Sequence, residues 1–536
     1  MKHTLSKLLA LLLSLLLAFA CVTPAFAAAE APTPVIVISG MNSFPLYLDE
    51  VKEENQVWPP SGKAIAKLVI KSLPSLAKSL ITRDLNIFAD ANFEDVFDVI
   101  FGAVACDEEG NSIHNIVYPT FPLSAGHYPD EILNSKENED EMGIVKGLVS
   151  AMGGDSVWFF NYDWRLDPMQ DARDLKAFID NVKAEKGADR VTLVPCSMGG
   201  AVVDAYLSLY GSDGIEKIIY TMVASKGIDL VGELFNGNVT LDLSVLTERL
   251  FNFKEGEWFA QVMLSLLKTV TDGTPGMNAL VSRFANWVLD TLSDRAYGEI
   301  FARSLVTMPG MWAFVPDSHY ESAKAKLFPD GGNKTFIDKI DAYHYGVQNN
   351  AETLLQAAKD NGTDLYVLAA YGFVGFPMTD LAYVQSDCLI ETKNESFGAT
   401  VAPYGKTLGD GYTAAGTVCA DKTHQHLSTD GIVDASTCLL PEQTWFIKFN
   451  RHVGFPVGTE TTDLMVWLVT AETPVDVRSD ARFPQFVKLN LMTGKLESLT
   501  GDTVKPSILD KESNTALRAL RLLLEAFDGI KAKISG

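Results

Sequence analysis

Cysteine, basic side chains and long apolar runs are all scarce in this chain of 536 residues. The six cysteines show no spacing that is typical of a structural zinc site. Lysine and arginine total 44 against 68 aspartate and glutamate residues, a formal net charge of −24, and a surface of that sign repels nucleic acid. Because 47% of the residues are hydrophobic and no tract is of low complexity, a disordered chain is excluded. The composition predicts a folded protein with a large core, no metal or other cofactor, and no nucleic-acid partner.

The N-terminus has the pattern of a secretory signal. Lys2 and Lys7 precede an apolar run over residues 8–20, which is too short to span a bilayer. Residues 25–27, Ala-Phe-Ala, supply the small side chains that a signal peptidase requires. We therefore expect residues 1–27 to be a signal peptide and the mature protein to be secreted or associated with the cell envelope.

The cysteines are compatible with export but do not fix a disulfide pattern. Cys21 leaves open processing as a lipoprotein, although Phe19 stands where a small residue is preferred. Cys419 and Cys438 are a plausible pair in an oxidising compartment, and the connectivity of the rest stays open.

Ser197 lies in a turn between a predicted strand, residues 190–194, and a predicted helix, residues 201–210. The turn reads Pro-Cys-Ser-Met-Gly-Gly over residues 195–200, and such a turn raises a nucleophilic serine above the sheet of an α/β-hydrolase. Its two glycines would allow the helix and the strand to approach closely, and the backbone N–H of Met198 would be one donor to an oxyanion. The motif predicts Ser197 as the nucleophile.

The candidate base comes from the chain order of the α/β-hydrolase triad, which is serine, acid, histidine. His452 follows a strand-like segment, residues 445–449, and precedes a helix-like segment, residues 463–469, which is where the base is expected. The pair at 424 and 426 is more typical of a solvated loop than of a metal site. The histidines that follow the serine are His319, His344, His424, His426 and His452; the sequence favours His452.

Asp430 is the preferred candidate for the acid. It opens Asp-Gly-Ile-Val-Asp, 22 residues ahead of His452, while Asp410 and Asp434 are weaker competitors. In this mechanism Asp430 would hold the tautomer of His452 while the histidine takes the serine proton. An oxyanion needs a second donor, and a buried strand that starts at residue 35 ends in a turn where the backbone N–H of Met41 is well placed.

Four blocks of sequence resemble the lecithin:cholesterol acyltransferase family of α/β-hydrolases. They are residues 34–42, Tyr-Asp-Trp-Arg at 162–165, Ser-Met-Gly at 197–199, and a set formed by Tyr-Gly at 371–372, Asp-Gly-Ile-Val at 430–433 and His452. The resemblance implies a lipase, phospholipase or lipid O-acyltransferase without a cofactor.

The resemblance also implies that Trp164 and Arg165 line the acyl and head-group end of the substrate pocket. Arg165 could face a phosphate there, or it could hold the wall through carboxylate pairs, and structural packing is an equal alternative for both residues. Pro195 and Cys196 depart from the family pattern of glycine and histidine, and Asp434 stands where a proline often follows. These departures leave the preference for an acyl acceptor open.

The chain exceeds a bare α/β-hydrolase core by roughly 200 residues, so insertions are expected. Apolar residues at helical spacing between 258 and 288 predict a cap, and a basic amphipathic stretch at 60–83 is either a solvated helix or a contact for anionic lipid. We predict an α/β fold, with a mostly parallel sheet between helices, in this order: signal peptide 1–27, first part of the core 28–226, helical cap 227–345, second part of the core 346–475, and a hairpin-plus-helix appendage 476–536.

Taken together, the motifs predict an exported serine hydrolase that forms an acyl-enzyme on Ser197 from a lipid or another hydrophobic ester, with transient contact to a lipid interface. Whether water or an alcohol accepts the acyl group depends on how the cap excludes water. Two alternatives stay open. One is a carboxylesterase for non-lipid esters, and the other is a surface-binding protein that has lost turnover.

Overall fold

The computed structural model describes most of the chain from residue 32 onward. The predicted signal peptide, Cys419, most of the apolar stripes of the predicted cap and the predicted C-terminal helix lie outside the described residues. Of Leu80, Glu139 and Asp140, only the backbone is described. The described residues are 32–134, 139–239, 287, 291–375, 383–416, 424–472, 474–491 and 493–499.

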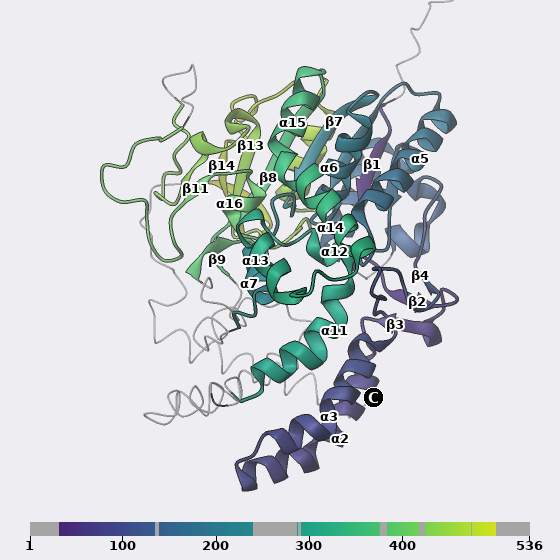
Figure 1. The fold of residues 1–536 in the computed structure, drawn as a ribbon. Helices are drawn as coiled ribbons and strands as arrows, with labels where there is room; N and C mark the ends of the chain where they lie inside the picture. Colours follow the sequence, from purple (N-terminus) through teal and green to yellow (C-terminus); the bar gives the residue numbers. More distant parts are fainter. Residues whose placement is uncertain are drawn as a thin grey trace, which may run out of the picture. The chain divides into compact units, whose positions relative to one another are not determined.

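Within the described residues, eight strands form one sheet in the order β15-β14-β13-β8-β7-β6-β1-β5 (Figure 1). Neighbouring strands are parallel, except that β15 is antiparallel to β14. The strands are β1 (Val35–Ile38), β5 (Val157–Phe160), β6 (Val191–Pro195), β7 (Ile215–Thr221), β8 (Asp364–Tyr371), β13 (Thr444–Lys448), β14 (Phe486–Asn490) and β15 (Lys495–Ser498). The fold class is α/β, as the sequence predicts, and the expected C-terminal hairpin is the edge of the central sheet.

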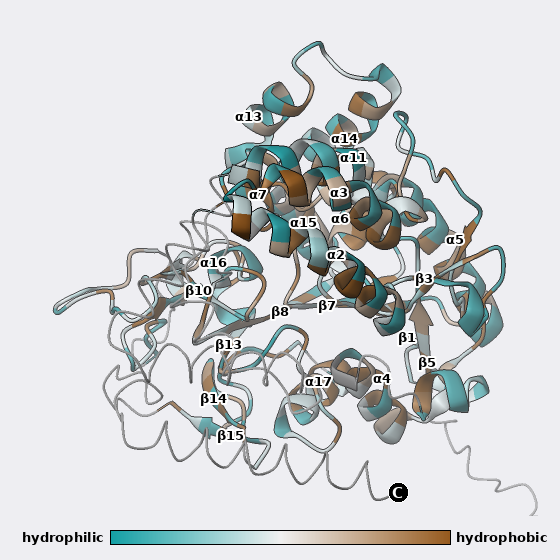
Figure 2. Ribbon diagram, turned by 90° about the horizontal axis from the view of Figure 1, so that it is seen from below, coloured by the Kyte–Doolittle hydropathy of each residue, from teal (hydrophilic) through white to brown (hydrophobic). Residues whose placement is uncertain are grey.

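Helices cover both faces of this sheet, which explains why its inner strands are mostly apolar and buried, whereas the edge strand β15 is largely exposed. Alternate side chains of β1 belong to different cores: Ile36 packs with residues of α5 and α6, and Val35 packs with residues of α4 and α17. Figure 2 shows α4 and α17 on one side of the strands, with α6 and α15 on the other. The helices are α4 (Glu139–Met152), α5 (Pro168–Lys186), α6 (Gly199–Tyr210), α15 (Ala351–Asp360) and α17 (Glu460–Thr470).

Further helices follow β7 and precede α15, in the region predicted as the cap. Their aromatic side chains, such as Phe235 and Trp312, join the same core as α5 and α6. They are α7 (Asp229–Phe235), α11 (Ala302–Ser304), α12 (Pro309–Trp312), α13 (Asp317–Leu327) and α14 (Lys334–Gly346). The described helices of this region therefore pack onto the core.

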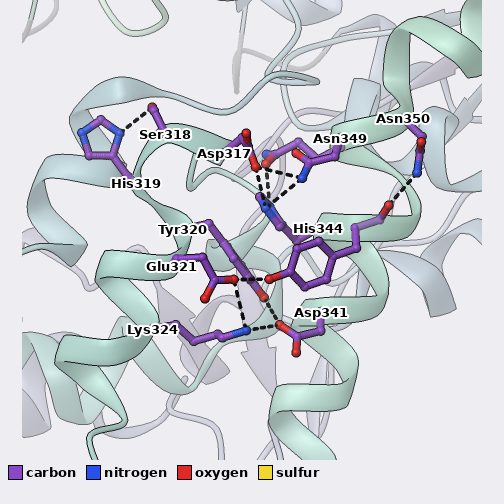
Figure 3. A network of polar contacts seen from close by, with 12 residues as sticks. Asp317, Ser318, His319, Tyr320, Glu321, Lys324, Asp341, His344, Asn349 and Asn350 are labelled. Atoms are coloured by element: carbon purple, nitrogen blue, oxygen red, sulfur yellow. Dashed lines mark hydrogen bonds and ion pairs between the residues drawn. The ribbon is translucent and has the colours of Figure 1, made fainter.

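A polar network fixes α13 against α14 (Figure 3). The rings of Tyr320 and His344 are stacked with centroids 3.6 Å apart, and the Tyr320 hydroxyl donates to Asp341 at 2.7 Å. His344 also lies 3.2 Å, Nε2 to Oδ1, from Asp317, at the start of α13. Burial lowers the pKa of His344 and outweighs the opposing effect of Asp317, so the neutral ring is favoured here.

The basic stretch predicted at 60–83 forms α2 (Gly62–Thr82), which packs against α3 (Asn86–Phe97). Ser61 caps α2 by accepting from the N–H of Ala64 at 3.2 Å, and Asn92 of α3 donates to the hydroxyl of Ser75 at 2.7 Å. None of the helices in the described part of the chain combines the length and hydrophobicity that a bilayer-spanning helix needs.

Short elements complete the described structure. The short strands and the short helix are β2 (Leu46–Leu48), β3 (Gln56–Trp58), β4 (Ile116–Val117), β9 (Phe373–Val374), β10 (Gln385–Ser386), α16 (Thr392–Glu395), β11 (Thr400–Val401) and β12 (Val433–Asp434). Among them, β10 and α16 are important for the site and lie in the segment that follows β8.

Candidate active site

Ser197 occupies a strained turn between β6 and α6. Its φ is 51°, a left-handed conformation that is uncommon for a residue other than glycine, and it is 6% exposed. The turn requires both glycines that follow. A Cβ on Gly199 would lie 2.7 Å from the carbonyl oxygen of Ile38, and one on Gly200 would lie 2.6 Å from Cβ of Val223. The close approach expected from the sequence is therefore present.

Cys196, beside the serine, is not a rival nucleophile. Its side chain is fully buried, and burial raises the pKa of the thiol well above its ordinary value. A buried thiol of this kind stays protonated and is a poor nucleophile.

The structure brings His452 to Ser197. The ring Nε2 of His452 lies 2.8 Å from the serine Oγ, although the two residues are 255 positions apart. His452 follows β13 and precedes α17, as the sequence predicts. The N–H of Val453, the next residue, donates to Sδ of Met222 at 3.1 Å and anchors this loop on the chain that follows β7.

The prediction of Asp430 as the acid is wrong, because Asp387 contacts the histidine. Oδ2 of Asp387 accepts a hydrogen bond from Nδ1 of His452, and the backbone N–H of His452 donates to the carbonyl of Asp387 at 2.9 Å. Asp387 follows β10 and is fully buried. Its other oxygen, Oδ1, accepts from the backbone N–H groups of Leu389 and Ile390, each at 2.7 Å. The chain order serine, acid, histidine is kept.

Asp430 has different partners. Its Oδ2 lies 2.7 Å from Nζ of Lys448 and accepts from the Tyr371 hydroxyl at 3.2 Å, while Oδ1 accepts from Ser428 at 2.7 Å. Tyr371 ends β8 and Lys448 ends β13, so Asp430 joins the ends of two neighbouring strands. A carboxylate neutralised by lysine in this way is a structural group.

Sequence reasoning missed Asp387 because both aspartates lie in the long connection between β8 and β13. Position along the chain does not separate them, since either satisfies the triad order. The Asp-Gly-Ile-Val pattern favoured Asp430, whereas Asp387 is followed by Cys388 and has no such motif. The only available signal was that Asp387 follows β8 more closely.

The backbone N–H groups of Met41 and Met198 are the donors predicted for an oxyanion. Gly40 lies against the nucleophile, because a Cβ on it would be 2.9 Å from Cβ of Ser197. The Gly40 N–H is taken by Oε1 of Glu141 at 2.9 Å. Among the described residues, the N–H groups of Met41 and Met198 donate no hydrogen bond. Both candidates thus keep a donor for a substrate.

The structure contradicts Arg165 as a substrate ligand. Its side chain is fully buried and forms a paired contact with Asp163, Nε to Oδ1 at 2.9 Å and Nη2 to Oδ2 at 2.6 Å. Its remaining contacts are the carbonyl of Val104 at 2.7 Å and the hydroxyl of Ser112 at 3.0 Å. The guanidinium therefore holds the wall together, and the surrounding protein shields it from any substrate.

Trp164 is 2% exposed and lies beside Trp58, with ring centroids 5.7 Å apart. Its Nε1 has no hydrogen-bond partner among the described residues. Its backbone is close to α12, because a Cβ on Gly310 would be 2.0 Å from the Trp164 carbonyl oxygen and 3.0 Å from the end of the Met198 side chain. The residue therefore lies near the serine turn.

One cluster in the described part of the chain combines carboxylate and imidazole atoms at metal-ligating distance. It consists of Asp387, Glu395 and His452, whose ligand atoms lie within 4.8 Å of one another. In this cluster Nδ1 of His452 is already engaged with Asp387.

The ring of His426, expected in a solvated loop, is instead buried, and its Nδ1 lies 2.8 Å from Gln485.

The sheet order, the serine turn after β6 and the late histidine define an α/β-hydrolase fold. The chain matches no protein-family model and no curated protein. None of the comparisons supports the lecithin:cholesterol acyltransferase family in particular.

Solved structures similar to the chain include three whose TM-scores are too low to support an argument. A chain of the Tle4-Tli4 complex has TM-score 0.19 and 17% identity, over 38% of this chain and 48% of that one. The esterase RhEst1 from Rhodococcus sp. ECU1013 has TM-score 0.15 and 13% identity, over 44% and 88%. A bromoperoxidase from Bacillus anthracis has TM-score 0.16 and 15% identity, over 61% and 92%. This chain therefore spans about half the length of the Tle4-Tli4 chain it matches.

Proposed function

We propose that the protein is a serine hydrolase that acts on a lipid or another hydrophobic ester through Ser197, His452 and Asp387. The observation that carries the proposal is the distance of 2.8 Å between the serine Oγ and Nε2 of His452, with Nδ1 of the same ring bonded to Asp387. Nucleophile, base and acid in this relation are the requirement for acyl transfer through serine.

In the proposed reaction, Asp387 holds the Nδ1–H tautomer of His452, so that Nε2 can take the serine proton. The serine oxygen then attacks the ester carbonyl, and the N–H groups of Met41 and Met198 bind the resulting oxyanion. His452 returns its proton to the leaving alcohol, and an acyl-enzyme remains. Water, or an alcohol in an acyltransferase, then removes the acyl group by the reverse steps.

A hydrophobic substrate is supported by the surface of α2. Apolar side chains stand out from this helix: Val69 is 54% exposed, Ile70 67%, Leu73 54% and Ile81 83%. The exposed lysines Lys63, Lys67 and Lys78 lie on the same helix. Apolar and basic side chains together are typical of a helix that lies in an anionic lipid interface. Export, which the N-terminal pattern predicts, would place the enzyme where such surfaces are found.

A fluorophosphonate probe tests the chemistry. We expect it to label the wild-type protein and not Ser197→Ala, with mass spectrometry placing the adduct on Ser197. Failure to label either protein would favour a binding module that has lost turnover. Activity on soluble short-chain esters, with none on emulsions or vesicles, would favour a non-lipid carboxylesterase instead.

The lipid interface is tested by flotation with vesicles that contain phosphatidylglycerol. Replacing Lys63, Lys67 and Lys78 by glutamine should release the protein from these vesicles and leave its activity on soluble esters unchanged. Lys71 is the matched control, because it is paired with Asp95 at 2.6 Å and Lys71→Gln should bind as the wild type does. Unchanged flotation of the triple variant would remove α2 from the proposal.

A further inference from the structure

Glu395 is a second buried carboxyl group beside the triad. It ends α16, is fully buried, and its Oε2 accepts from the backbone N–H of Ala370 in β8 at 2.7 Å. One of its carboxylate oxygens lies within 4.8 Å of a carboxylate oxygen of Asp387 and of a ring nitrogen of His452. Neither the resemblance to known hydrolases nor the triad accounts for a carboxyl group at this position.

Two buried carboxyl groups this close together favour sharing one proton at neutral pH, because two adjacent negative charges away from water are costly. The surrounding donors decide which group holds it. Asp387 accepts from two backbone N–H groups, those of Leu389 and Ile390, and from the ring of His452. Glu395 accepts from Ala370 alone, and its Oε1 has no donor partner among the described residues. The proton therefore belongs on Oε1 of Glu395.

The directions of the pKa shifts agree with this assignment. Burial and the negative charge of Asp387 raise the pKa of Glu395 well above its ordinary value. Burial alone would raise the pKa of Asp387, but the nearby charge of His452 and the hydrogen bond from Glu395 outweigh it and lower the pKa.

We propose that Glu395 is a positioning residue that stays protonated and donates a hydrogen bond to the Asp387 carboxylate, which extends the triad to a fourth side chain. The inference rests on the proposed function, since it concerns the same site. Oε1 donates to Asp387, Oε2 accepts from β8, and the triad acid is thereby tied to the central sheet. Without this bond, Asp387 would depend on its own loop for its orientation toward His452.

Glu395→Gln is the sharpest test, because glutamine can reproduce the arrangement. Its amide oxygen can accept from Ala370 while its NH₂ donates to Asp387. If Glu395 is neutral, the substitution changes no charge, and the acid limb of the kcat/KM profile for a p-nitrophenyl ester should stay at its wild-type pH. The wild type should lose activity on the alkaline side as Glu395 ionises, and Glu395→Gln should not.

An ionised Glu395 would give the opposite result. Its replacement would then remove a buried negative charge near His452 and move the acid limb to lower pH by about one unit or more. That shift would overturn the proposal. A second pair of results would also overturn it: the wild type loses activity on treatment with EDTA, and Glu395→Gln is inactive. Together these results would indicate a cation held by ionised Asp387 and Glu395.

Glu391→Gln is the matched control, since Glu391 is buried in the same loop but accepts from the N–H of Asp229 at 3.0 Å instead of contacting the triad. The acid limb of the kcat/KM profile of Glu391→Gln should stay at the wild-type pH. Glu395→Leu, which removes the donor, should move the acid limb upward and lower kcat more than it raises KM. If this variant fails to fold, Glu395→Gln alone still decides the question.

An NMR titration separates failure of this inference from failure of the proposed function. The His452 ring signals can be followed in Ser197→Ala and in Ser197→Ala combined with Glu395→Gln, where no turnover is needed. Equal titration midpoints support a neutral Glu395, and a midpoint lowered by about one pH unit contradicts it. Absence of phosphonate labelling would refute the hydrolase while this measurement still reports on Glu395.

Discussion

Asp387 accepts two hydrogen bonds from His452, one from its backbone N–H and one from its ring. The two residues are 65 positions apart, and the backbone bond places the loop of the histidine directly on the loop of the acid. The ring therefore has little freedom to rotate, and its Nε2 faces Ser197.

The first prediction separates the two candidate acids. Asp387→Asn should lower kcat by about 10³- to 10⁴-fold, because an amide can donate to Nδ1 and so favours the wrong tautomer of His452. Asp430→Asn is the matched control and should keep kcat within about tenfold, since Asp430 contacts Lys448 and not the histidine. Steady-state kinetics on a soluble ester decide, and a larger loss in Asp430→Asn would restore Asp430 as the acid.

The second prediction concerns the same ion pair and measures stability. Asp430 and Lys448 have side chains that are 1% and 16% exposed. Asp430→Asn should lower the free energy of unfolding by about 3 kcal/mol, because it leaves a mostly buried ammonium without its counter-charge. Urea denaturation checks this, and combining Asp430→Asn with Lys448→Met should recover part of the loss. Equal stability of wild type and single variant would show that the pair is not a structural link.

The third prediction tests the serine turn. A side chain at Gly199 would overlap the Ile38 carbonyl, so Gly199→Ala should displace the turn and lower the rate of phosphonate labelling by roughly 100-fold. Gly298→Ala is the control, because nothing lies within 4 Å of its added Cβ. That variant should label at the wild-type rate and gain up to about 1 kcal/mol of stability. Normal labelling of Gly199→Ala would mean that the turn is not closely packed.

The fourth prediction concerns the buried guanidinium of Arg165. Arg165→Met should lower the free energy of unfolding by about 3–5 kcal/mol, since Asp163 would keep an unpaired buried charge. The ratio of kcat/KM for a phospholipid to that for an uncharged ester should not change, because the guanidinium has no access to substrate. If Arg165→Met is too unstable, Arg165→Lys gives the same ratio test. A selective loss of phospholipid activity would contradict the structural role.

The fifth prediction is a pH dependence of stability at Glu391. Burial, followed by the charge of Asp229, raises the pKa of Glu391 to about 7. The folded state thus binds a proton more tightly than the unfolded state, and this contribution to stability is lost as pH rises between about 4.5 and 7. Asp229 itself lies 3.1 Å, Oδ2 to Nζ, from Lys393.

Glu391→Gln should remove this dependence, because a neutral amide still accepts from the Asp229 N–H. Urea denaturation at several pH values should find it close to wild type near pH 5 and more stable by on the order of 3 kcal/mol near pH 8. The exposed Glu54→Gln should show no such trend. A gap that does not widen with pH would mean that Glu391 is not neutralised in this range.

The serine turn and the place of the histidine could be predicted from the sequence because both depend on local geometry. Glycine is needed at positions 199 and 200 because the helix starts directly against a strand there. His452 lies between an apolar strand and a helix, and both can be recognised from short stretches of sequence. The α/β class follows from the same local patterns, repeated along the chain.

Only the tertiary structure decided which carboxylate serves His452 and what Arg165 contacts. Asp387 and Asp430 share one long connection, and the path by which that connection folds back onto the ends of β8 and β13 is set by contacts between distant residues, such as Asp430 with Lys448 and Glu395 with Ala370. A charged side chain is directed by the partner it finds in space. That partner cannot be predicted from the spacing of residues along the chain when the connection between them has no regular secondary structure.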